Sequence, residues 1–141
     1  MPDARINPKA RQAIEMADYL IIGPGDLYTS IIPVILADGV SAAIKKSKAK
    51  IVFIMNLMTK SGQTTGYKAS DHIGDLTRYL GRKPDFVLIN NTRISEKILE
   101  SYKRYNEISV KNDLLLRAVT KQVILIMDLI DNSDTFHSTT N

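Results

Sequence analysis

The sequence predicts an α/β fold in which helices flank a mostly parallel sheet in three layers. Short apolar runs alternate with longer segments whose apolar residues recur at helical spacing. The apolar runs begin about 30 to 37 residues apart, which is the length expected of a strand–helix–strand unit. At 141 residues, the chain fits a single domain with a sizeable core.

Four segments have the apolar spacing of helices. The first is expected from about residue 8 to 17, because Asn7 suits the cap position and Pro8 the first helical position. The other three are residues 31 to about 47, 70–80 and 95–105. Each of these three lies between two apolar runs, as the crossover helices of a parallel sheet do.

Four runs are short and apolar throughout, namely residues 19–22, 51–54, 86–89 and 123–127. Strands of this kind are typical of a parallel sheet that is buried on both faces. We therefore expect them to be parallel neighbours with their carboxyl ends at one edge. A shorter pair, residues 108–110 and the leucines at 114–116, predicts an edge strand and a helical turn before the last strand.

Composition excludes several classes of function. The absence of cysteine excludes disulfides, thiolate catalysis and cysteine metal sites. No apolar run is long enough to span a bilayer, and the first residues lack the apolar core of a signal peptide, so a cytoplasmic protein is expected. The net charge is +4, and the lysines at 45–50 have no interleaved aromatic residue, which favours a solvated helix end over a nucleic-acid surface.

Polar loops follow the first three predicted strands. They read GPGDLYTS at 23–30, NLMTKSGQTTGY at 56–67 and NNTR at 90–93. In open parallel sheets, ligands bind beyond the carboxyl ends of the strands. A loop with two glycines lets the backbone approach a ligand, and the hydroxyls of Thr29 and Ser30 with nearby helix amides can bind phosphate oxygens. The loops favour an anionic or sugar-like ligand, although the first also fits a sharp turn in which Thr29 or Ser30 only caps a helix.

The remaining polar residues show no catalytic pattern. Neither a Walker-type phosphate loop nor a Gly-x-Gly-x-x-Gly fingerprint is present. Two histidines without a carboxylate at ligand spacing argue against a zinc site. His72 is interpreted as a helix-surface or loop-packing residue rather than a catalytic base, and Asp71 and Asp75 as like charges solvated on one helix face. No catalytic residue is assigned.

Three ordered motifs resemble a known family. They are ADYLIIGPGDLYTSIIPVIL, NLMTKSGQTTGYKASDHI and FVLINN. Together they are similar to the second half of the YvcK-like, or gluconeogenesis factor, family, which also includes the CofD-type 2-phospho-L-lactate transferases. The resemblance covers most of residues 10 to about 130. It implies a Rossmann-like fold that binds a nucleotide sugar such as UDP-N-acetylglucosamine, in bacterial proteins tied to carbon metabolism, cell-wall supply and cell shape.

The resemblance implies a set of ligand-binding residues in the three loops. They are Gly23, Pro24, Gly25, Leu27, Tyr28, Thr29, Ser30, Asn56, Met58, Thr59, Thr64, Tyr67, Asn90 and Asn91. Three positions depart from the family's motifs: Asp26 replaces serine, Val34 replaces asparagine and Gln63 replaces glutamate. Asp26 adds negative charge where a phosphate would approach. A phosphorylated ligand then needs a bridging divalent cation such as magnesium, with Asp26 as a candidate metal ligand.

Two classes of function follow from the resemblance. The first is a non-catalytic regulator that binds a UDP-sugar or a related nucleotide, favoured by the Leu-Tyr-Thr-Ser turn and by the lack of an evident nucleophile–base pair. The alternative is a 2-phospho-L-lactate transferase-like enzyme of deazaflavin cofactor biosynthesis, which rests on shared fold. Neither reading involves nucleic acid or a membrane.

Family members begin with a glycine-rich strand–turn–helix that has no counterpart in this sequence. Residues 1–141 are therefore expected to form a single α/β unit that is the C-terminal portion of a longer YvcK/CofD-like domain. One sheet edge and one helical face would then be exposed. Association with the missing N-terminal half or in a homo-oligomer is expected to cover them.

Overall fold

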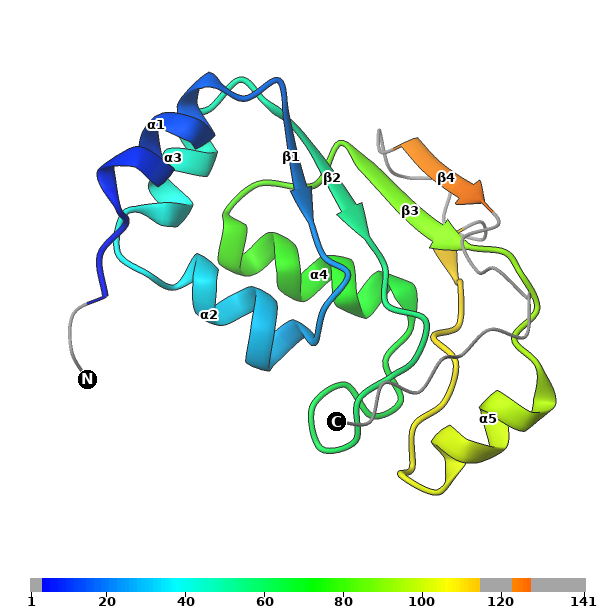
Figure 1. The fold of residues 1–141 in the computed structure, drawn as a ribbon. Coiled ribbons are helices and arrows are strands. Elements are labelled where there is room, and N and C mark those ends of the chain that lie inside the picture. Colours follow the sequence, from blue (N-terminus) through cyan, green and yellow to red (C-terminus); the bar gives the residue numbers. More distant parts are fainter. Residues whose placement is uncertain (1–3, 115–122, 128–141) are drawn as a thin grey trace, which may run out of the picture.

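A computed structural model describes residues 4–114 and 123–127 of the chain. In this part, one parallel sheet has the strand order β1-β2-β3-β4. Its strands are β1 (Tyr19–Ile22), β2 (Lys50–Ile54), β3 (Phe86–Asn90) and β4 (Val123–Met127), which lie side by side in Figure 1. The predicted α/β class is confirmed, and so is the parallel pairing of the four predicted strands.

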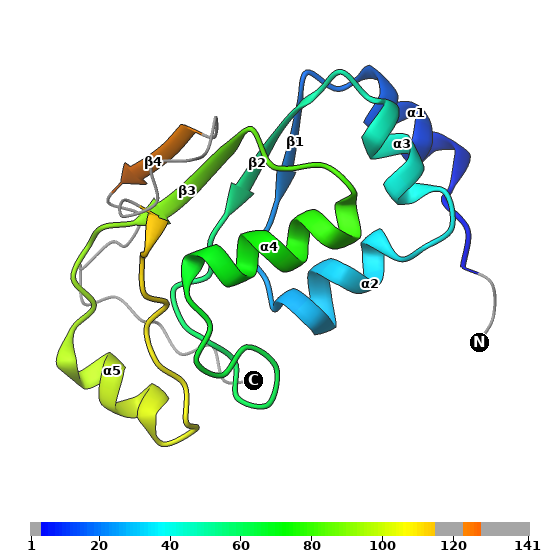
Figure 2. The same ribbon diagram turned by 180° about the vertical axis from the view of Figure 1, so that it is seen from behind.

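The described helices are α1 (Pro8–Met16), α2 (Ile32–Ile35), α3 (Val40–Lys46), α4 (Ala69–Leu80) and α5 (Glu96–Lys103). Helices α2 to α4 cover one face of this sheet, and α1 packs on α3. Figure 2, seen from behind, shows α4 and α2 in front of the strands, whereas α5 lies beyond the carboxyl ends of the strands. The first helix begins as predicted, because Asn7 Oδ1 accepts a hydrogen bond from Lys9 N at 2.9 Å.

The single helical segment predicted from residue 31 to about 47 is divided into α2 and α3. The break is at Gly39, whose φ of +87° lies in the left-handed region. Just before it, Asp38 pairs with the chain's first described residues: its N–H donates to Ala4 O, and its carbonyl accepts from Ile6 N, both at 2.8 Å. A continuous helix would forbid this pairing, and apolar spacing alone carries no signal for it.

The core lies between the sheet and helices α2 to α4. Ile51, Phe53 and Val87 point to this face from the strands, and Leu76 and Leu80 meet them from α4, each at most 1% exposed. Alternation along each strand gives this pattern, because successive side chains point to opposite faces. The covered face therefore supplies most of the burial that stabilises the fold.

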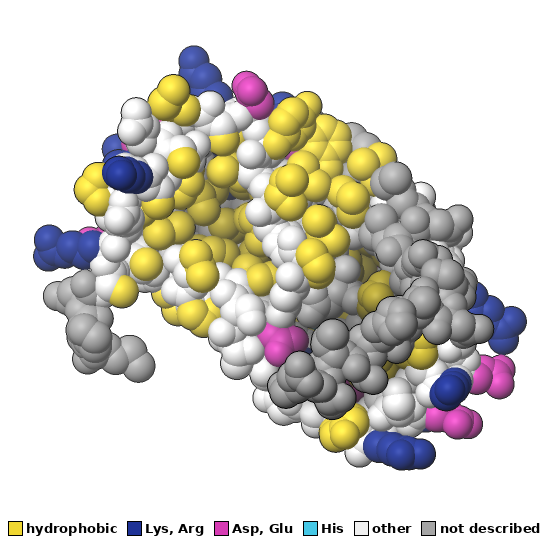
Figure 3. Space-filling model, in the orientation of Figure 1, with side chains coloured by type: hydrophobic (Ala, Val, Ile, Leu, Met, Phe, Trp, Pro, Cys, Tyr) yellow, Lys and Arg dark blue, Asp and Glu magenta, His cyan; other side chains and the backbone are white. Residues whose placement is uncertain are grey.

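The opposite face of the sheet is also apolar. The register aligns Ile21 with Val52 and Phe86, and aligns Ile54 with Leu88 and Leu125. Ile21 is 68% exposed, and the space-filling view shows hydrophobic side chains gathered over the strands (Figure 3). The strands are thus apolar on both faces as predicted, but no helix of the described residues covers the second face.

Residues 108–110 pair with the loop after β2 rather than with an edge of the sheet. Met58 and Ser109 form an antiparallel bridge, and Val110 N donates to Leu57 O at 2.9 Å. The expected edge strand is therefore wrong, because these residues find backbone partners in the loop. Of the predicted turn at 114–116, residues 115 and 116 lie outside the described residues. Among the described helices, none is long and apolar enough to cross a membrane.

Candidate functional site

The loop after β1 begins with a close approach of two backbones. Gly23 has a φ of +82°, and a Cβ at this residue would lie 2.7 Å from Ile54 O at the end of β2. Gly25 N then donates to Asn56 Oδ1 at 2.9 Å. Only glycine fits the first position, so the two glycines tie the first loop to the end of the neighbouring strand.

A π-helical turn, Leu27–Ile31, follows the two glycines. It closes where Ile31 N donates to Asp26 O at 3.1 Å. Turns of this kind are rare and recur at functional sites. Leu27 and Ile31 are buried in the core, whereas Thr29 and Ser30 are exposed, so the turn presents two hydroxyl groups at the carboxyl edge of the sheet.

Tyr28 points the other way, into a cluster with Tyr67 and Asp75. Asp75 Oδ2 accepts hydrogen bonds from both phenol hydroxyls, at 2.8 Å from Tyr67, and the two hydroxyl oxygens are 3.1 Å apart. The hydrogen bond from Tyr28 holds the pKa of Asp75 below its ordinary value, against the opposing effect of burial. The same bond raises the pKa of Tyr28. The interpretation of Asp75 as a solvated charge was therefore wrong, whereas Asp71 is exposed.

Two threonines of the second loop and His72, in the first turn of α4, also make hydrogen bonds within the fold. His72 is 2% exposed, its Nδ1 lies 3.0 Å from Lys68 O, and its ring packs edge-on against Tyr67, so the loop-packing interpretation holds. Thr64 Oγ1 accepts from Lys60 N at 2.8 Å. Thr59 Oγ1 accepts from Ile108 N at 3.0 Å. These bonds shape the loop.

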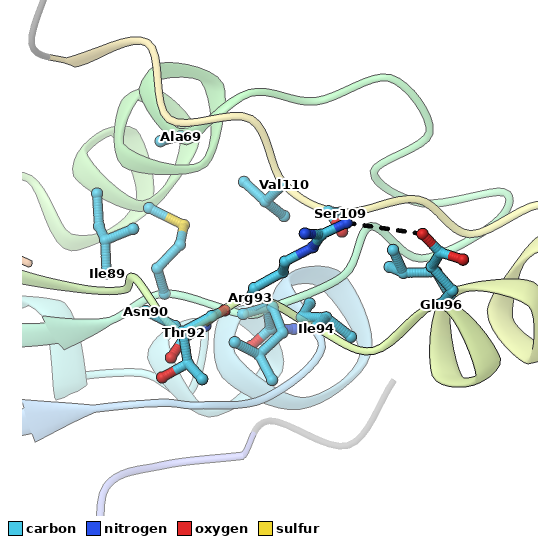
Figure 4. A pocket seen from close by; sticks show the side chains of 13 residues that line it. Ala69, Ile89, Asn90, Thr92, Arg93, Ile94, Glu96, Ser109 and Val110 are labelled. Atoms are coloured by element: carbon cyan, nitrogen blue, oxygen red, sulfur yellow. Dashed lines mark hydrogen bonds and ion pairs between the residues drawn. The ribbon is translucent and has the colours of Figure 1, made fainter. Parts of the chain in front are cut away.

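Two adjoining cavities lie at the carboxyl edge of the sheet, and both are lined by Met55, Asn56 and Leu57. We call the first the Arg93 cavity; it has a volume of about 340 Å³. Figure 4 shows Arg93 extending toward Glu96, with Ser109 and Val110 close by. The Arg93–Glu96 ion pair is long, at 3.6 Å, and both side chains are more than four-fifths exposed. Asn90 also lines this cavity, and its Nδ2 donates to Thr92 O at 2.8 Å.

The second cavity, which we call the Lys60 cavity, has a volume of about 410 Å³. It lies between the first loop, the residues that follow β2, and the chain segment from Tyr102 to Glu107. Lys60 Nζ and Glu107 Oε1 form an ion pair at 2.9 Å, and Glu107 is only 6% exposed. The hydrogen bond to Glu107, followed by the charges of Glu107 and Asp26, raises the pKa of Lys60 and keeps it protonated.

The predicted site residues fall into three groups. Pro24, Met58 and Thr59 line the Lys60 cavity, Asn90 lines the Arg93 cavity, and Asn56 lines both. Tyr28, Thr64 and Tyr67 make hydrogen bonds within the fold, and Gly23, Gly25 and Leu27 shape the first loop. Thr29, Ser30 and Asn91 are exposed. Their roles in ligand binding stay predictions.

Sequence reasoning missed four charged or aromatic residues at this edge, namely Lys60, Arg93, Tyr102 and Glu107. Glu107 lies 47 positions after Lys60 in a stretch with no recognisable motif. Lys60 is within the second polar loop and Arg93 within the third, so their loop positions were the available signal. For a metal, no group of three or more histidine, cysteine or acidic residues is suitably placed within residues 4–114 and 123–127. A magnesium ion at Asp26 stays a prediction.

A sequence profile of the family described as "2-phospho-L-lactate transferase CofD" matches residues 1–129. The chain belongs to the CofD family. A Thermotoga maritima protein named "Putative gluconeogenesis factor" is 46% identical in an alignment of 131 residues that covers 90% of this chain and 41% of that protein. A Streptococcus pyogenes protein of the same name is 32% identical over 134 residues, 92% of this chain and 41% of that protein. The family resemblance of the three motifs is confirmed.

A crystal structure of a UPF0052-family protein from Bacillus halodurans has the same fold as this CofD-family chain. The two superpose with a TM-score of 0.86 at 32% identity, covering 94% of this chain and 44% of that one. The chain thus spans about two fifths of the length of these relatives. What the relatives do as whole proteins is carried over to this chain only as a proposal.

Proposed function

We propose that this chain forms part of a nucleotide-sugar site, of the UDP-N-acetylglucosamine type, in a gluconeogenesis factor that regulates carbon metabolism, cell-wall supply and cell shape. The observation that carries the proposal is the pair of cavities that meet at Asn56 beyond the carboxyl ends of β2 and β3. This is where open parallel sheets bind nucleotides. Each cavity has a size typical of small-molecule sites. Relatives named gluconeogenesis factor support the metabolic setting.

The diphosphate of such a ligand fits the first loop best. Thr29 and Ser30 offer exposed hydroxyl groups there, and Ser30 lies close to Gly25. Arg93 offers a cation at the same edge of the sheet, and its ion pair with Glu96 is exposed to solvent. Exposed pairs contribute about 0–1 kcal/mol, so the guanidinium is free to turn toward a phosphate at little cost.

Calorimetric titration with UDP-N-acetylglucosamine tests the proposal. We expect Ser30→Ala to weaken binding roughly ten- to a hundredfold, because a hydrogen bond to a charged group contributes about 1.5–3 kcal/mol. Ser101→Ala is the matched control: this serine is exposed on α5, and its hydroxyl donates to Ile98 O at 2.7 Å. Equal affinity in wild type and Ser30→Ala would remove the first loop from the site.

The alternative function is 2-phospho-L-lactate transferase-like activity. It predicts a different result in the same preparation. If the protein binds no UDP-sugar, yet transfers a phospholactyl group to a deazaflavin acceptor, the regulator proposal is wrong and the transferase takes its place. Product formation is followed by chromatography of the deazaflavin.

A further inference from the structure

We propose that the Lys60 cavity holds the glycosyl group of the ligand. In this arrangement, the carboxylates of Asp26 and Glu107 accept hydrogen bonds from sugar hydroxyls, and the ring of Tyr102 packs on the sugar. The inference rests on the proposed nucleotide-sugar function and deepens it. It assigns recognition to Glu107 and Tyr102, which lie outside all three family-like motifs.

The charges in the cavity decide which part of the ligand it can take. Two carboxylates, of Asp26 and Glu107, face one ammonium group, of Lys60. The ammonium is already paired with Glu107 at 2.9 Å. A diphosphate would therefore enter a cavity of net negative charge, which Coulomb repulsion opposes. A neutral group rich in hydroxyls meets no such barrier, because hydroxyls donate hydrogen bonds to carboxylates.

Lys60 is a poor phosphate ligand for a second reason. If its ammonium turned toward a phosphate, Glu107 would remain as a buried carboxylate without its cation. The Lys60 side chain is 44% exposed, but the Glu107 side chain is only 8% exposed, and leaving a buried carboxylate without its cation is unfavourable. The pair is better kept intact, with Lys60 fixing the Glu107 carboxylate so that its remaining lone pairs can accept from a ligand. A carboxylate has about four acceptor positions, and one ammonium does not fill them.

The backbone holds Glu107 and Tyr102 as one unit. Glu107 N donates to Tyr102 O at 3.2 Å, and the next amide, of Ile108, donates to Thr59 Oγ1 at 3.0 Å. Asn106, which lies between Tyr102 and Glu107 in the sequence, has a φ of +58°, the left-handed conformation that asparagine tolerates better than most residues. This turn after α5 brings the acidic side chain back over the cavity. Both residues are thus positioned before any ligand arrives.

The other lining residues suit a sugar as well. Apolar side chains of Pro24, Ile54 and Met58 contribute to the wall, and Asn56 adds an amide that can both donate and accept. The side chain of Tyr102 is 39% exposed, which leaves part of its ring open to a ligand. A site with apolar walls and a few placed polar groups is the usual form of a small-molecule pocket. The volume of about 410 Å³ leaves room for a hexosamine.

Titrating each protein with both UDP-N-acetylglucosamine and UDP isolates the glycosyl contacts. A substitution that alters contacts to the diphosphate or uridine changes the affinities for both ligands by the same factor. A substitution that alters contacts to the sugar changes only the affinity for UDP-N-acetylglucosamine, and so changes the ratio of the two affinities. We expect wild type to bind UDP-N-acetylglucosamine about tenfold more tightly than UDP. Glu107→Gln should reduce this ratio to about 1–2, since a hydrogen bond to a charged group is worth about a factor of ten or more. Tyr102→Ala should also reduce the ratio, because the sugar loses the ring on which it packs. In both variants the UDP affinity should change less than about twofold.

Glu100→Gln is the matched control, because this glutamate is exposed on α5 and lines neither cavity. A thermal melt checks that each variant folds. If Glu107→Gln does not fold, Tyr102→Ala provides the test by itself. An unchanged ratio in the variants, or equal losses for both ligands, overturns the inference while the proposed function stands. If wild type binds neither ligand, the proposed function fails first, and the inference fails with it.

Discussion

The phenol hydroxyls of Tyr28 and Tyr67 lie 3.1 Å apart and meet on one carboxylate oxygen of Asp75. The three residues come from the first polar loop, the second polar loop and helix α4, so this cluster joins both loops to the core. Arg78 extends the cluster with an ion pair to Asp75 Oδ1 at 3.5 Å. The tyrosines act by fixing the loops that carry the cavities, since their hydroxyls are already bonded within the fold.

Removing one phenol hydroxyl should weaken this cluster. We expect Tyr28→Phe to lower the free energy of unfolding by about 1.5–3 kcal/mol, because it removes a hydrogen bond to a charged carboxylate. Tyr105→Phe is the control, since Tyr105 is 71% exposed and should change stability by less than about 0.5 kcal/mol. Urea denaturation measures both. Equal effects of the two substitutions would contradict a stabilising role for the cluster.

The same cluster should make stability depend on pH in the acidic range. The pKa of Asp75 is lower in the folded protein than its ordinary value of about 3.9, chiefly because of the hydrogen bond from Tyr28. A lowered folded-state pKa contributes stability that is present above the unfolded pKa and lost as pH falls through the folded pKa. We therefore expect the stability difference between wild type and Asp75→Asn to shrink on acidification.

Unfolding free energies measured from about pH 6 down to about pH 2 test this expectation. Asp18→Asn, which alters an exposed carboxylate at the start of β1, is the control and should keep a constant difference from wild type. A difference between wild type and Asp75→Asn that stays constant or grows toward low pH would contradict the assignment.

Much of the fold could be predicted because it depends on local patterns. Apolar runs predicted the strands, and helical spacing predicted α1, with the help of a good cap, and α4 to within one or two residues. The break at Gly39 could not be predicted, because it depends on pairing between Asp38 and the distant residues Ala4 and Ile6. The misplaced strand at 108–110 has the same origin, since its partners are in the loop after β2.

The candidate site could be predicted only in its position. Parallel strands bring their following loops to one edge, and Asn56 and Asn90 there line the Arg93 cavity; their role in binding stays a prediction. The partners of individual side chains depend on packing, so Asp75 could not be distinguished from Asp71 by helix spacing alone. Glu107 could not be found either, because its partner, Lys60, is distant in the sequence.

Replacing an apolar side chain by alanine should cost much more stability on the covered face of the sheet than on the opposite face. Phe53 is 1% exposed in the core, so Phe53→Ala should cost about 3–5 kcal/mol of stability. Ile21, on the opposite face of the sheet, is 68% exposed, and Ile21→Ala should cost less than about 1 kcal/mol. Chemical denaturation of dilute protein measures both. A large loss in Ile21→Ala would show that the second face is covered in solution.

Asp26 should oppose the binding of phosphate groups. We expect Asp26→Ser to tighten UDP binding about two- to tenfold at low salt, because it removes a negative charge from the edge of the site. Titrations with and without magnesium separate repulsion from metal binding. If magnesium tightens binding in wild type and this gain is absent in Asp26→Ser, the carboxylate holds a cation instead.

Two glycines provide the sharpest test of the geometry of the first loop. An alanine at Gly23 would put its Cβ 2.7 Å from Ile54 O, with a φ of +82° that alanine rarely adopts. We expect Gly23→Ala to cost more than about 2 kcal/mol of stability, because the contact is with backbone that cannot move aside.

Gly74 is the matched position, since it lies inside α4 and nothing would be within 4 Å of an added Cβ. Gly74→Ala should therefore stabilise the protein by about 0.5–1 kcal/mol through its higher helix propensity. Urea denaturation measures the free energy of unfolding, which should fall in Gly23→Ala and rise in Gly74→Ala. A Gly23→Ala protein as stable as wild type would mean that the first loop does not press against β2.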